Sequence, residues 1–504
     1  MTIFDRARTD PEGLALDDGT RQRSWAELAE RSTRLAHFLR EEAGLAPDDH
    51  AAILMGNRVE YVEIILGAIL AGIWLTPVNR HLARDEIAYT LRDSGAKWVF
   101  SDEAHAAPAR AAGAATVLTV GDPLERALVS ASDAPVDPSG PPGATMIYTS
   151  GTTGRPKGVK RTRPATLANA LDQHARMGRR YGLDGSGPHL ITGPMYHAAP
   201  LLFAIYDLAN GASLVIMPRW DEREALRLLA SRDIAHTHMV PTMFVRLLRL
   251  PEEERAAFRA PRLSLLMHGA APVSVPVKRR MIEWLGPVLL EYWGATEGGI
   301  NSLASSEEWL ARPGTVGRAL PAFEIFARDE AGRRLPPGEI GLLYCRHRQL
   351  AKVFEYHGAP AKTAEAHPEP HLFTLGDVGH VSDDGWVFLA DRRSHTIISG
   401  GVNVYPAEVE QVIQEHPAVA DVAVFGIPDE EWGEAVKAAV ELAPGYEAGA
   451  ALEGEILAFG REHLARYKLP RSIDFEAQLP RHESGKLYVR KLREPYWRGR
   501  ERRI

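Results

Sequence analysis

The sequence contains almost no cysteine and no excess of basic residues. Cys345 is the single cysteine in 504 residues, which excludes an intrachain disulfide and fits a reducing compartment, so a cytoplasmic location is expected. Lysines and arginines number 59 against 66 aspartates and glutamates, giving a net charge of -7. Because no overall positive field would attract a polyanion, a nucleic acid is not an expected partner.

Long hydrophobic runs are also missing. The longest, residues 64–75, has about a dozen residues, whereas a membrane-spanning helix needs roughly 20. We interpret this run as a buried helix followed by the start of a strand, and we predict no membrane span. The first residues, MTIFDRARTD, carry charges where a signal peptide needs its apolar stretch, so secretion is not expected either.

Two widespread catalytic motifs are absent as well. The chain has neither a G-x-S-x-G nucleophile elbow nor a G-x-G-x-x-G dinucleotide loop. His236 and His238 flank Thr237 in a predicted strand, but no cysteine partner or third ligand accompanies them, so a zinc site is not predicted. The chemistry must therefore be sought in other motifs.

Helical and strand patterns alternate along the first half of the chain. Residues 24–42 and 60–72 have helical periodicity, and residues 50–56 form a short apolar run between them. Further β-type runs, SLVIMP, THMVPT and LSLLMHGAAP, follow at intervals. Such alternation is typical of βαβ units around a mostly parallel sheet. A chain of 504 residues also exceeds one ordinary core, so at least two domains are expected.

The pattern changes in the last third of the chain. After about residue 310, short strands joined by Gly and Pro turns indicate a smaller β-rich unit. After about residue 394 an α+β pattern begins, with helices in 408–417 and 453–467 and a strand pair between them. We place the main boundary at Asp391 to Ser394, which gives domains of residues 1–391 and 392–504.

The stretch YTSGTTGRPKGVK, residues 148–160, is rich in hydroxyls and glycines and follows a β-type segment. Backbone N–H groups and hydroxyls in such a loop can converge on anionic oxygens, and Lys157 adds a positive charge. The candidate phosphate ligands are Thr149, Ser150, Gly151, Thr152, Thr153, Gly154 and Lys157. The loop lacks the Walker A spacing, and from these residues alone a polar hairpin tip remains the alternative.

YTSGTTGRPKG resembles the phosphate-binding signature of the adenylate-forming superfamily, which includes acyl-CoA synthetases, aryl-CoA ligases, firefly luciferase and peptide-synthetase adenylation domains. Five further motifs follow in the order of that family: HGAAP, EYWGATEGG, FTLGDVG, DRRSHTIISGGVNVYPAEVE and LPRHESGKLYVRKL. The resemblance runs from about residue 10 to 495. It implies an α/β fold, with a large N-terminal domain of flanked sheets plus a distorted β-barrel and a small mobile α+β C-terminal domain.

The resemblance also assigns the nucleotide site. It implies that the hydroxyl and glycine loop holds the β- and γ-phosphates of ATP, that Thr296 contacts the α-phosphate and that Glu297 holds Mg²⁺. The implied base and ribose ligands are Gly269, Ala270, Ala271, Trp293, Asp377 and Arg392. Relatives usually carry Tyr at the position of Trp293; an indole keeps the aromatic face but not the hydroxyl.

The remaining implied residues serve catalysis and the acceptor. Lys486 matches the family's catalytic lysine, whose ammonium bridges the carboxylate and the α-phosphate. His197, in PMYHAAP, matches a positioning residue beside the substrate carboxylate. A glycine strip matches the tunnel for coenzyme A, and its residues are Ser399, Gly400 and Gly401. Ser394 and His395 depart from the acidic or basic residues usual at the hinge, which puts the second half-reaction in question.

The implied reaction joins a carboxylic acid to AMP and then to CoA, with ATP, Mg²⁺ and CoA as the small-molecule partners. The run YHAAPLLFAIYDL and the small residues Gly298 and Gly299 favour a roomy apolar pocket, and hence a fatty acid or a bulky alicyclic or terpenoid acid. Three alternatives stay open: adenylation alone with a carrier protein or separate transferase as acceptor, a luciferase-type monooxygenase, and a non-catalytic sensor. The oligomeric state, a homodimer included, stays open too.

Overall fold

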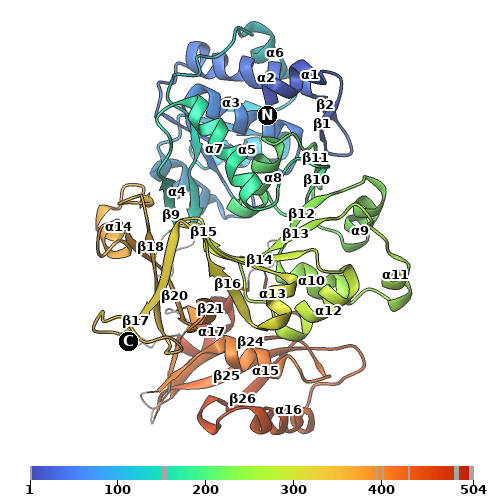
Figure 1. The fold of residues 1–504 in the computed structure, drawn as a ribbon, viewed down its shortest axis with the longest axis vertical. Coiled ribbons are helices and arrows are strands. Elements are labelled where there is room, and N and C mark those ends of the chain that lie inside the picture. The colour runs from blue at the N-terminus through green and yellow to red at the C-terminus, as the bar shows by residue number, and fades with distance from the viewer. Residues whose placement is uncertain are drawn as a thin grey trace.

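The computed structural model describes residues 3–149, 156–392, 396–399, 402–429, 432–481 and 487–498. Figure 1 shows the N-terminal elements at the top, a large sheet in the middle and the C-terminal elements at the bottom. Within the described ranges, no helix combines the length and the apolar character needed to cross a bilayer.

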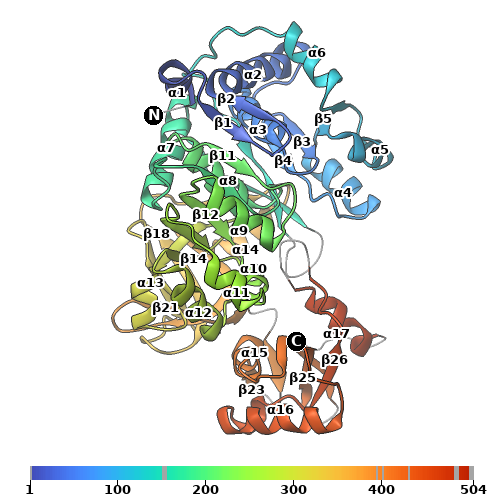
Figure 2. The same ribbon diagram turned by 90° about the vertical axis from the view of Figure 1, so that its right-hand side faces the viewer.

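The upper part contains a parallel five-stranded sheet in the order β6-β5-β3-β4-β7. Its strands are β3 (His50–Leu54), β4 (Trp74–Pro77), β5 (Trp98–Ser101), β6 (Val117–Thr119) and β7 (Ala144–Thr145). Alternate residues of β3 face opposite sides: Ile53 packs toward α2 (Trp25–His37) and α3 (Val59–Ala71), and Leu54 packs toward α4 (Arg84–Ser94) and α5 (Glu103–Ala111). Figure 2 shows α4 and α5 on the side of this sheet away from α2 and α3. The predicted buried helix and strand start in residues 64–75 are confirmed as the end of α3 and the start of β4.

The middle part is a 13-stranded sheet in the order β17-β18-β20-β21-β16-β15-β14-β13-β12-β10-β11-β1-β2. The runs predicted as parallel strands are confirmed as β11, β12 and β13. From β14 onward the pairing is antiparallel, so the predicted β-rich unit continues the parallel sheet. The strands are β1 (Leu14–Asp17), β2 (Gln22–Ser24), β10 (His189–Ile191), β11 (Leu214–Ile216), β12 (His236–Met239), β13 (Leu265–His268), β14 (Leu289–Ala295), β15 (Gly299–Ser305), β16 (Thr315–Ala319), β17 (Phe323–Arg328), β18 (Gly341–His347), β20 (Leu372–Val381) and β21 (Trp386–Arg392).

Helices cover this sheet on both faces. Two of them, α9 and α10, pack with α12 against one face, while α7 and α8 pack against the other beside the antiparallel strands. The remaining helices are α1 (Ile3–Thr9), α6 (Asp122–Ser130), α7 (Leu167–Arg180), α8 (Ala198–Leu208), α9 (Glu222–Ser231), α10 (Pro241–Leu248), α11 (Glu252–Ala257), α12 (Val275–Leu285), α13 (Ser306–Ala311) and α14 (Pro360–Ala366), with a π-helical turn at Phe38–Glu42. This arrangement is the expected α/β fold.

The C-terminal part has its own sheet and core. The predicted strand pair is confirmed as β24 (Val419–Asp429) with β25 (Gly433–Leu442), and the two predicted helices as α15 (Pro406–Ile413) and α16 (Ala450–His463). The sheet is completed by β22 (Ile397–Ser399), β23 (Val402–Val404) and β26 (Ser472–Glu476), followed along the chain by α17 (Val489–Trp497). A short 3-10 turn covers Arg466–Lys468. The chain passes between the two sheets after Arg392, and we propose domains of residues 1–391 and 392–504.

A three-stranded sheet connects the upper and middle parts. It consists of β8 (Ile147–Thr149), β9 (Lys157–Arg161) and β19 (Phe354–Tyr356), with β9 in the centre. Because Thr149 and Lys157 are partners across an antiparallel pair, the hydroxyl and glycine loop leaves and re-enters the sheet at one point. This sheet therefore fixes both ends of the loop.

Candidate functional site

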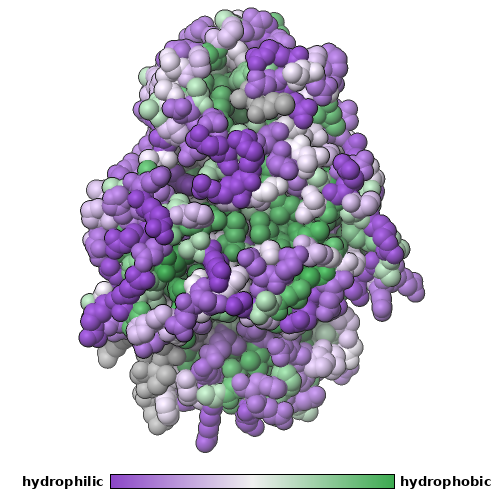
Figure 3. Space-filling view, in the orientation of Figure 1, coloured by the Kyte–Doolittle hydropathy of each residue, from purple (hydrophilic) through white to green (hydrophobic). Residues whose placement is uncertain are grey.

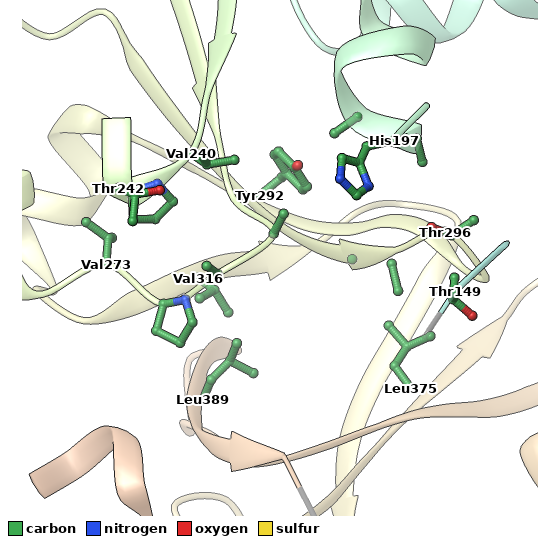
Figure 4. A pocket seen from close by; sticks show the side chains of 18 of the residues that line it. Thr149, His197, Val240, Thr242, Val273, Tyr292, Thr296, Val316, Leu375 and Leu389 are labelled. Atoms are coloured by element: carbon green, nitrogen blue, oxygen red, sulfur yellow. The ribbon is translucent and has the colours of Figure 1, made fainter. Parts of the chain in front are cut away.

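A cavity of about 980 Å³ lies where these parts meet. Its walls come from β8 and β9, the start of α8, the β14 to β15 turn, the loop after β13 and the face of α15. Figure 4 shows His197 and Tyr292 projecting into it, with Thr149 and Thr296 at one end. Figure 3 shows hydrophobic side chains gathering across the middle of this face of the molecule, above the C-terminal part.

One end of the cavity is polar. The Thr149 and Tyr356 hydroxyls each donate to Oε1 of Glu297, both at 3.2 Å. The Lys157 ammonium lies 5.1 Å from the centroid of the Tyr356 ring. Three segments far apart in sequence thus bring a carboxylate, an ammonium and two hydroxyls together beside Thr296. Such a set can hold phosphate oxygens and a hard cation.

Two tyrosines hold the strands that carry the loop. The Tyr89 hydroxyl, on α4, donates to the carbonyl oxygen of Pro156 at 3.0 Å. The Tyr148 hydroxyl donates to Oδ2 of Asp93, also on α4, at 2.6 Å. Burial and then this bond to Asp93 raise the pKa of Tyr148, which keeps its hydroxyl protonated as a donor. Helix α4 therefore anchors the chain on both sides of the loop.

The loop after β13 approaches β14 closely. A Cβ on Gly269 would lie 2.6 Å from the carbonyl oxygen of Tyr292, so only glycine fits there. Ala270 has a φ of 64°, in the left-handed region that side chains rarely adopt. Ala270 and Ala271 line the cavity, whereas Gly269 is not among its lining residues. Strained backbone of this kind is common where a ligand meets the chain.

A buried ion pair lies between the helix and the strand next to this loop. Lys278, on α12, donates to Oε2 of Glu291, on β14, and its ammonium lies 4.7 Å from the centroid of the Trp309 ring. Burial lowers the pKa of Lys278, and burial raises the pKa of Glu291. His268, at the end of β13, lies 4.0 Å from the same carboxylate. The pair joins α12, the helix that follows the Ala270 loop, to β14, the strand against which the loop packs.

Trp293 and Asp377 are brought together across the large sheet. The Trp293 indole Nε1–H donates to Oδ2 of Asp377 at 2.8 Å, and both side chains are buried. Neither lines the cavity, where the wall is formed by the neighbouring Tyr292. The contact of Trp293 and Asp377 with a nucleotide therefore stays a prediction.

The other end of the cavity has aromatic walls. Its walls include Tyr181, Phe203, Tyr206 and Ile300, from α8, β15 and the turn after α7. Helix α8 begins directly after His197, whose ring lies 4.5 Å from the Tyr196 ring between centroids. The nearby His238 is neutral, because burial lowers its pKa to about 3.

Some predicted site residues lie outside the described ranges. These are Ser150, Gly151, Thr152, Thr153, Gly154, Gly400, Gly401 and Lys486, together with the hinge residues Ser394 and His395. The backbone of Arg392 pairs with Asp377 between β21 and β20. Ser399 is buried on β22 and pairs with Gly433.

Three residues that line the cavity were not predicted as site residues: Tyr356, Lys468 and Arg481, although Arg481 lies within the motif LPRHESGKLYVRKL. Tyr356 reaches Glu297 from β19, which carries no motif. Lys468 and Arg481 line the cavity from the C-terminal part, where they pair with Glu408 and Asp421. Among the described residues, no cluster of three or more His, Cys, Asp or Glu side chains could hold a metal. Nδ1 of His236, a residue considered for zinc, lies 2.7 Å from Oδ2 of Asp207.

Residues 3–354 match the family model described as AMP-binding enzyme, and residues 408–486 match that of the AMP-binding enzyme C-terminal domain. The chain belongs to the AMP-binding enzyme family. The family resemblance and the fold drawn from the sequence motifs are thereby confirmed. Membership makes the chain an AMP-forming acid-thiol ligase, an enzyme that activates an acid by ATP-dependent adenylation.

Named family members match along nearly their whole length. The chain is 32% identical to a fatty acid–[acyl-carrier-protein] ligase of Streptomyces coeruleorubidus, with 100% of this chain and 97% of that protein covered. It is 33% identical to a long-chain-fatty-acid–CoA ligase of Mycobacterium tuberculosis, with 94% and 93% covered. The structure of an o-succinylbenzoate coenzyme A synthetase of Bacillus subtilis with ATP and magnesium matches with a TM-score of 0.82 at 26% identity, with 97% and 98% covered.

Proposed function

We propose that this family member activates a hydrophobic carboxylic acid, a fatty acid or a bulky alicyclic or terpenoid acid, to its acyl-adenylate and then transfers the acyl group to CoA. The observation that carries the proposal is one cavity with two contrasting ends. Thr149, Lys157 and Glu297 gather at one end, and aromatic walls form the other. If the substrate carboxylate lies between the two ends, ATP is on its polar side and the apolar part of the substrate extends into the aromatic end.

The polar end would hold the ATP phosphates. Thr149 and Lys157 flank the loop 150–155 in the chain, and both line the polar end of the cavity. We assign the loop residues to the β- and γ-phosphates, which leave as pyrophosphate, and Thr296 to the α-phosphate. The substrate carboxylate oxygen attacks the α-phosphorus while the bond to the bridging oxygen of pyrophosphate breaks, which gives acyl-AMP.

The residues present also fit a magnesium ion. Mg²⁺ in nucleotide sites is bound by one or two carboxylates plus substrate phosphates, and it keeps several waters. Glu297 supplies one such carboxylate, and the hydroxyls of Thr149 and Tyr356 orient it. When bound, the ion would neutralise charge on the departing pyrophosphate.

Trp293 would act as a positioning residue through Asp377, the proposed ribose ligand. Replacing Trp293 with Phe removes the indole N–H but keeps an aromatic ring, so Asp377 loses a hydrogen bond that orients it. We expect the KM for ATP to rise about 10-fold with kcat nearly unchanged, measured by pyrophosphate release. Trp386→Phe is the matched control, because the buried indole N–H of Trp386 has no partner among the described residues. Equal effects of the two substitutions would contradict this role.

The second half-reaction needs the C-terminal part to move. We assign Lys486 to the α-phosphate in the first step. It would leave the active site as the C-terminal domain turns about Asp391 to Ser394. The strip of Ser399, Gly400 and Gly401 would then guide the CoA thiol past His197. Thiolate attack on the acyl carbonyl forms the thioester and expels AMP. The departures at Ser394 and His395 make an acyl carrier protein, the acceptor in the name of one relative, the alternative acceptor.

An acid panel tests the first step. ATP–pyrophosphate exchange is measured with fatty, alicyclic, terpenoid, short polar and amino acids. We expect exchange with the hydrophobic acids, because the cavity walls beyond His197 are aromatic. Exchange confined to amino acids or short polar acids would overturn the assignment. Thioester formation with free CoA, compared with a holo acyl carrier protein, then identifies the acceptor.

A further inference from the structure

Arg161 lines the cavity and, unlike the other cations there, has no partner among the described residues. Lys157 lies over the Tyr356 ring, Lys468 pairs with Glu408 and Arg481 pairs with Asp421. The Arg161 guanidinium has no hydrogen bond, ion pair or ring contact with any residue that the structure describes. A charge that is half-buried without a partner is unfavourable unless a ligand or water compensates it.

The position of Arg161 separates it from the phosphate site. Lys157 and Arg161 lie at opposite ends of β9 and on the same face, about 13 Å apart along the strand. Val159, between them, belongs to the core that contains Tyr181 and Phe203. Arg161 therefore lies on the aromatic side of the cavity, and not among the residues assigned to pyrophosphate.

The turn after Glu297 leaves space for the guanidinium. A Cβ on Gly299 would lie 2.7 Å from Nη2 of Arg161, so a side chain there would displace the charged group. Gly299 also has a φ of 70°, which favours glycine. Gly299 comes three residues after Thr296, so their Cα atoms lie at most roughly 10 Å apart, and the guanidinium lies directly beside Gly299.

The neighbours of Arg161 do not neutralise it. Burial, and then the charge of Arg161, lower the pKa of His174 to about 4, so this imidazole is neutral. Burial raises the pKa of Tyr181, which keeps its hydroxyl as a donor, and its one acceptor among the described residues is Sδ of Met177 at 4.0 Å. The aromatic end therefore offers a guanidinium and a hydroxyl, both suited to an acceptor carried by the substrate.

We infer that the natural acid carries a second anionic group, in the simplest case a carboxylate, which binds Arg161 while the first carboxylate is adenylated. This inference rests on the proposed function and narrows it from a plain hydrophobic acid to a dicarboxylic acid with a hydrophobic body. Two forked N–H groups of a guanidinium match the two oxygens of a carboxylate, which gives direction as well as attraction. A methyl-terminated chain would leave the charge unpaired.

The test compares matched acids in pyrophosphate exchange. Heptanedioate, nonanedioate and undecanedioate are paired with heptanoate, nonanoate and undecanoate, and kcat/KM is measured for the wild type and for Arg161→Met. We expect the wild type to prefer the diacid at its best chain length, and Arg161→Met to lower that kcat/KM by about 10- to 150-fold. The kcat/KM for the monoacids should stay within about threefold, since they never paired with the charge.

Lys160→Met is the matched control, because Lys160 is the neighbouring cation on β9 and contacts Nε2 of His50 at 3.0 Å, outside the cavity. A charge reversal, Arg161→Glu, should transfer the preference to 7-aminoheptanoate. Exchange with monoacids at rates equal to those with diacids, unaffected by Arg161→Met, overturns the inference and leaves the proposed function standing. Exchange with no acid of either series overturns both.

Discussion

Replacing Lys486 with alanine is expected to lower acyl-adenylate formation by roughly 100- to 1000-fold, the usual loss when one preorganised donor to a developing charge is removed. In the proposed reaction the ammonium stabilises the α-phosphate as the substrate carboxylate attacks it. ATP binding should change little, because the loop 150–155, Lys157 and Asp377 are assigned to it. Pyrophosphate release in single-turnover mixing measures the step.

The matched control is Lys491→Ala. Lys491 is on α17 of the same C-terminal part, and its ammonium lies 4.6 Å from the centroid of the Tyr488 ring. Its replacement removes one positive charge, as Lys486→Ala does. Its activity should stay close to wild type. Thioester formation from chemically supplied acyl-AMP and CoA should also survive Lys486→Ala, because this lysine is assigned only to the first step. Adenylation by Lys486→Ala at the wild-type rate would contradict the mechanism.

Glu297→Gln is expected to lower kcat/KM for ATP by about 100-fold or more, since the amide keeps the shape of the side chain but not the charge that a magnesium ion needs. Thr149 and Tyr356 can still donate to the amide oxygen, so the polar end should keep its geometry. Kinetics across a range of Mg²⁺ concentrations show whether the loss lies in metal binding.

A neighbouring carboxylate provides the comparison. Glu355, on β19, is half-exposed and pairs with Lys352 at 2.7 Å. Glu355→Gln should leave the Mg²⁺ dependence unchanged. If Glu297→Gln had a wild-type Mg²⁺ dependence and rate, the metal assignment would be wrong.

Local patterns were enough to predict most of the fold. In the C-terminal part, hydrophobic residues repeat every two residues in β24 and β25 and every 3.6 residues in α15 and α16, because each element buries one regular face. The continuation of the parallel sheet into antiparallel strands could not be predicted this way. That order depends on pairing between β14 and β15 and between β16 and β21, which are set by long-range packing.

The site divides in the same way. Thr296 and Glu297 could be found because the motif residues are contiguous, whereas Tyr356 contacts Glu297 from 59 residues away with no motif of its own. The loss of a tyrosine hydroxyl at Trp293 was evident from the sequence. The hydrogen bond from the indole N–H to Asp377, 84 residues later, could not be predicted from the sequence. Arg161 follows the loop motif directly, but that it has no partner among the described residues can be seen only in three dimensions.

The central claim is that a carboxylate oxygen attacks the α-phosphorus of ATP. The most direct measurement uses a hydrophobic acid labelled with heavy oxygen in its carboxylate, in a full turnover with CoA, followed by mass spectrometry of the phosphate products. We predict that AMP acquires one labelled oxygen and that pyrophosphate acquires none. Label in inorganic phosphate or pyrophosphate, or ADP as the nucleotide product, would contradict the account.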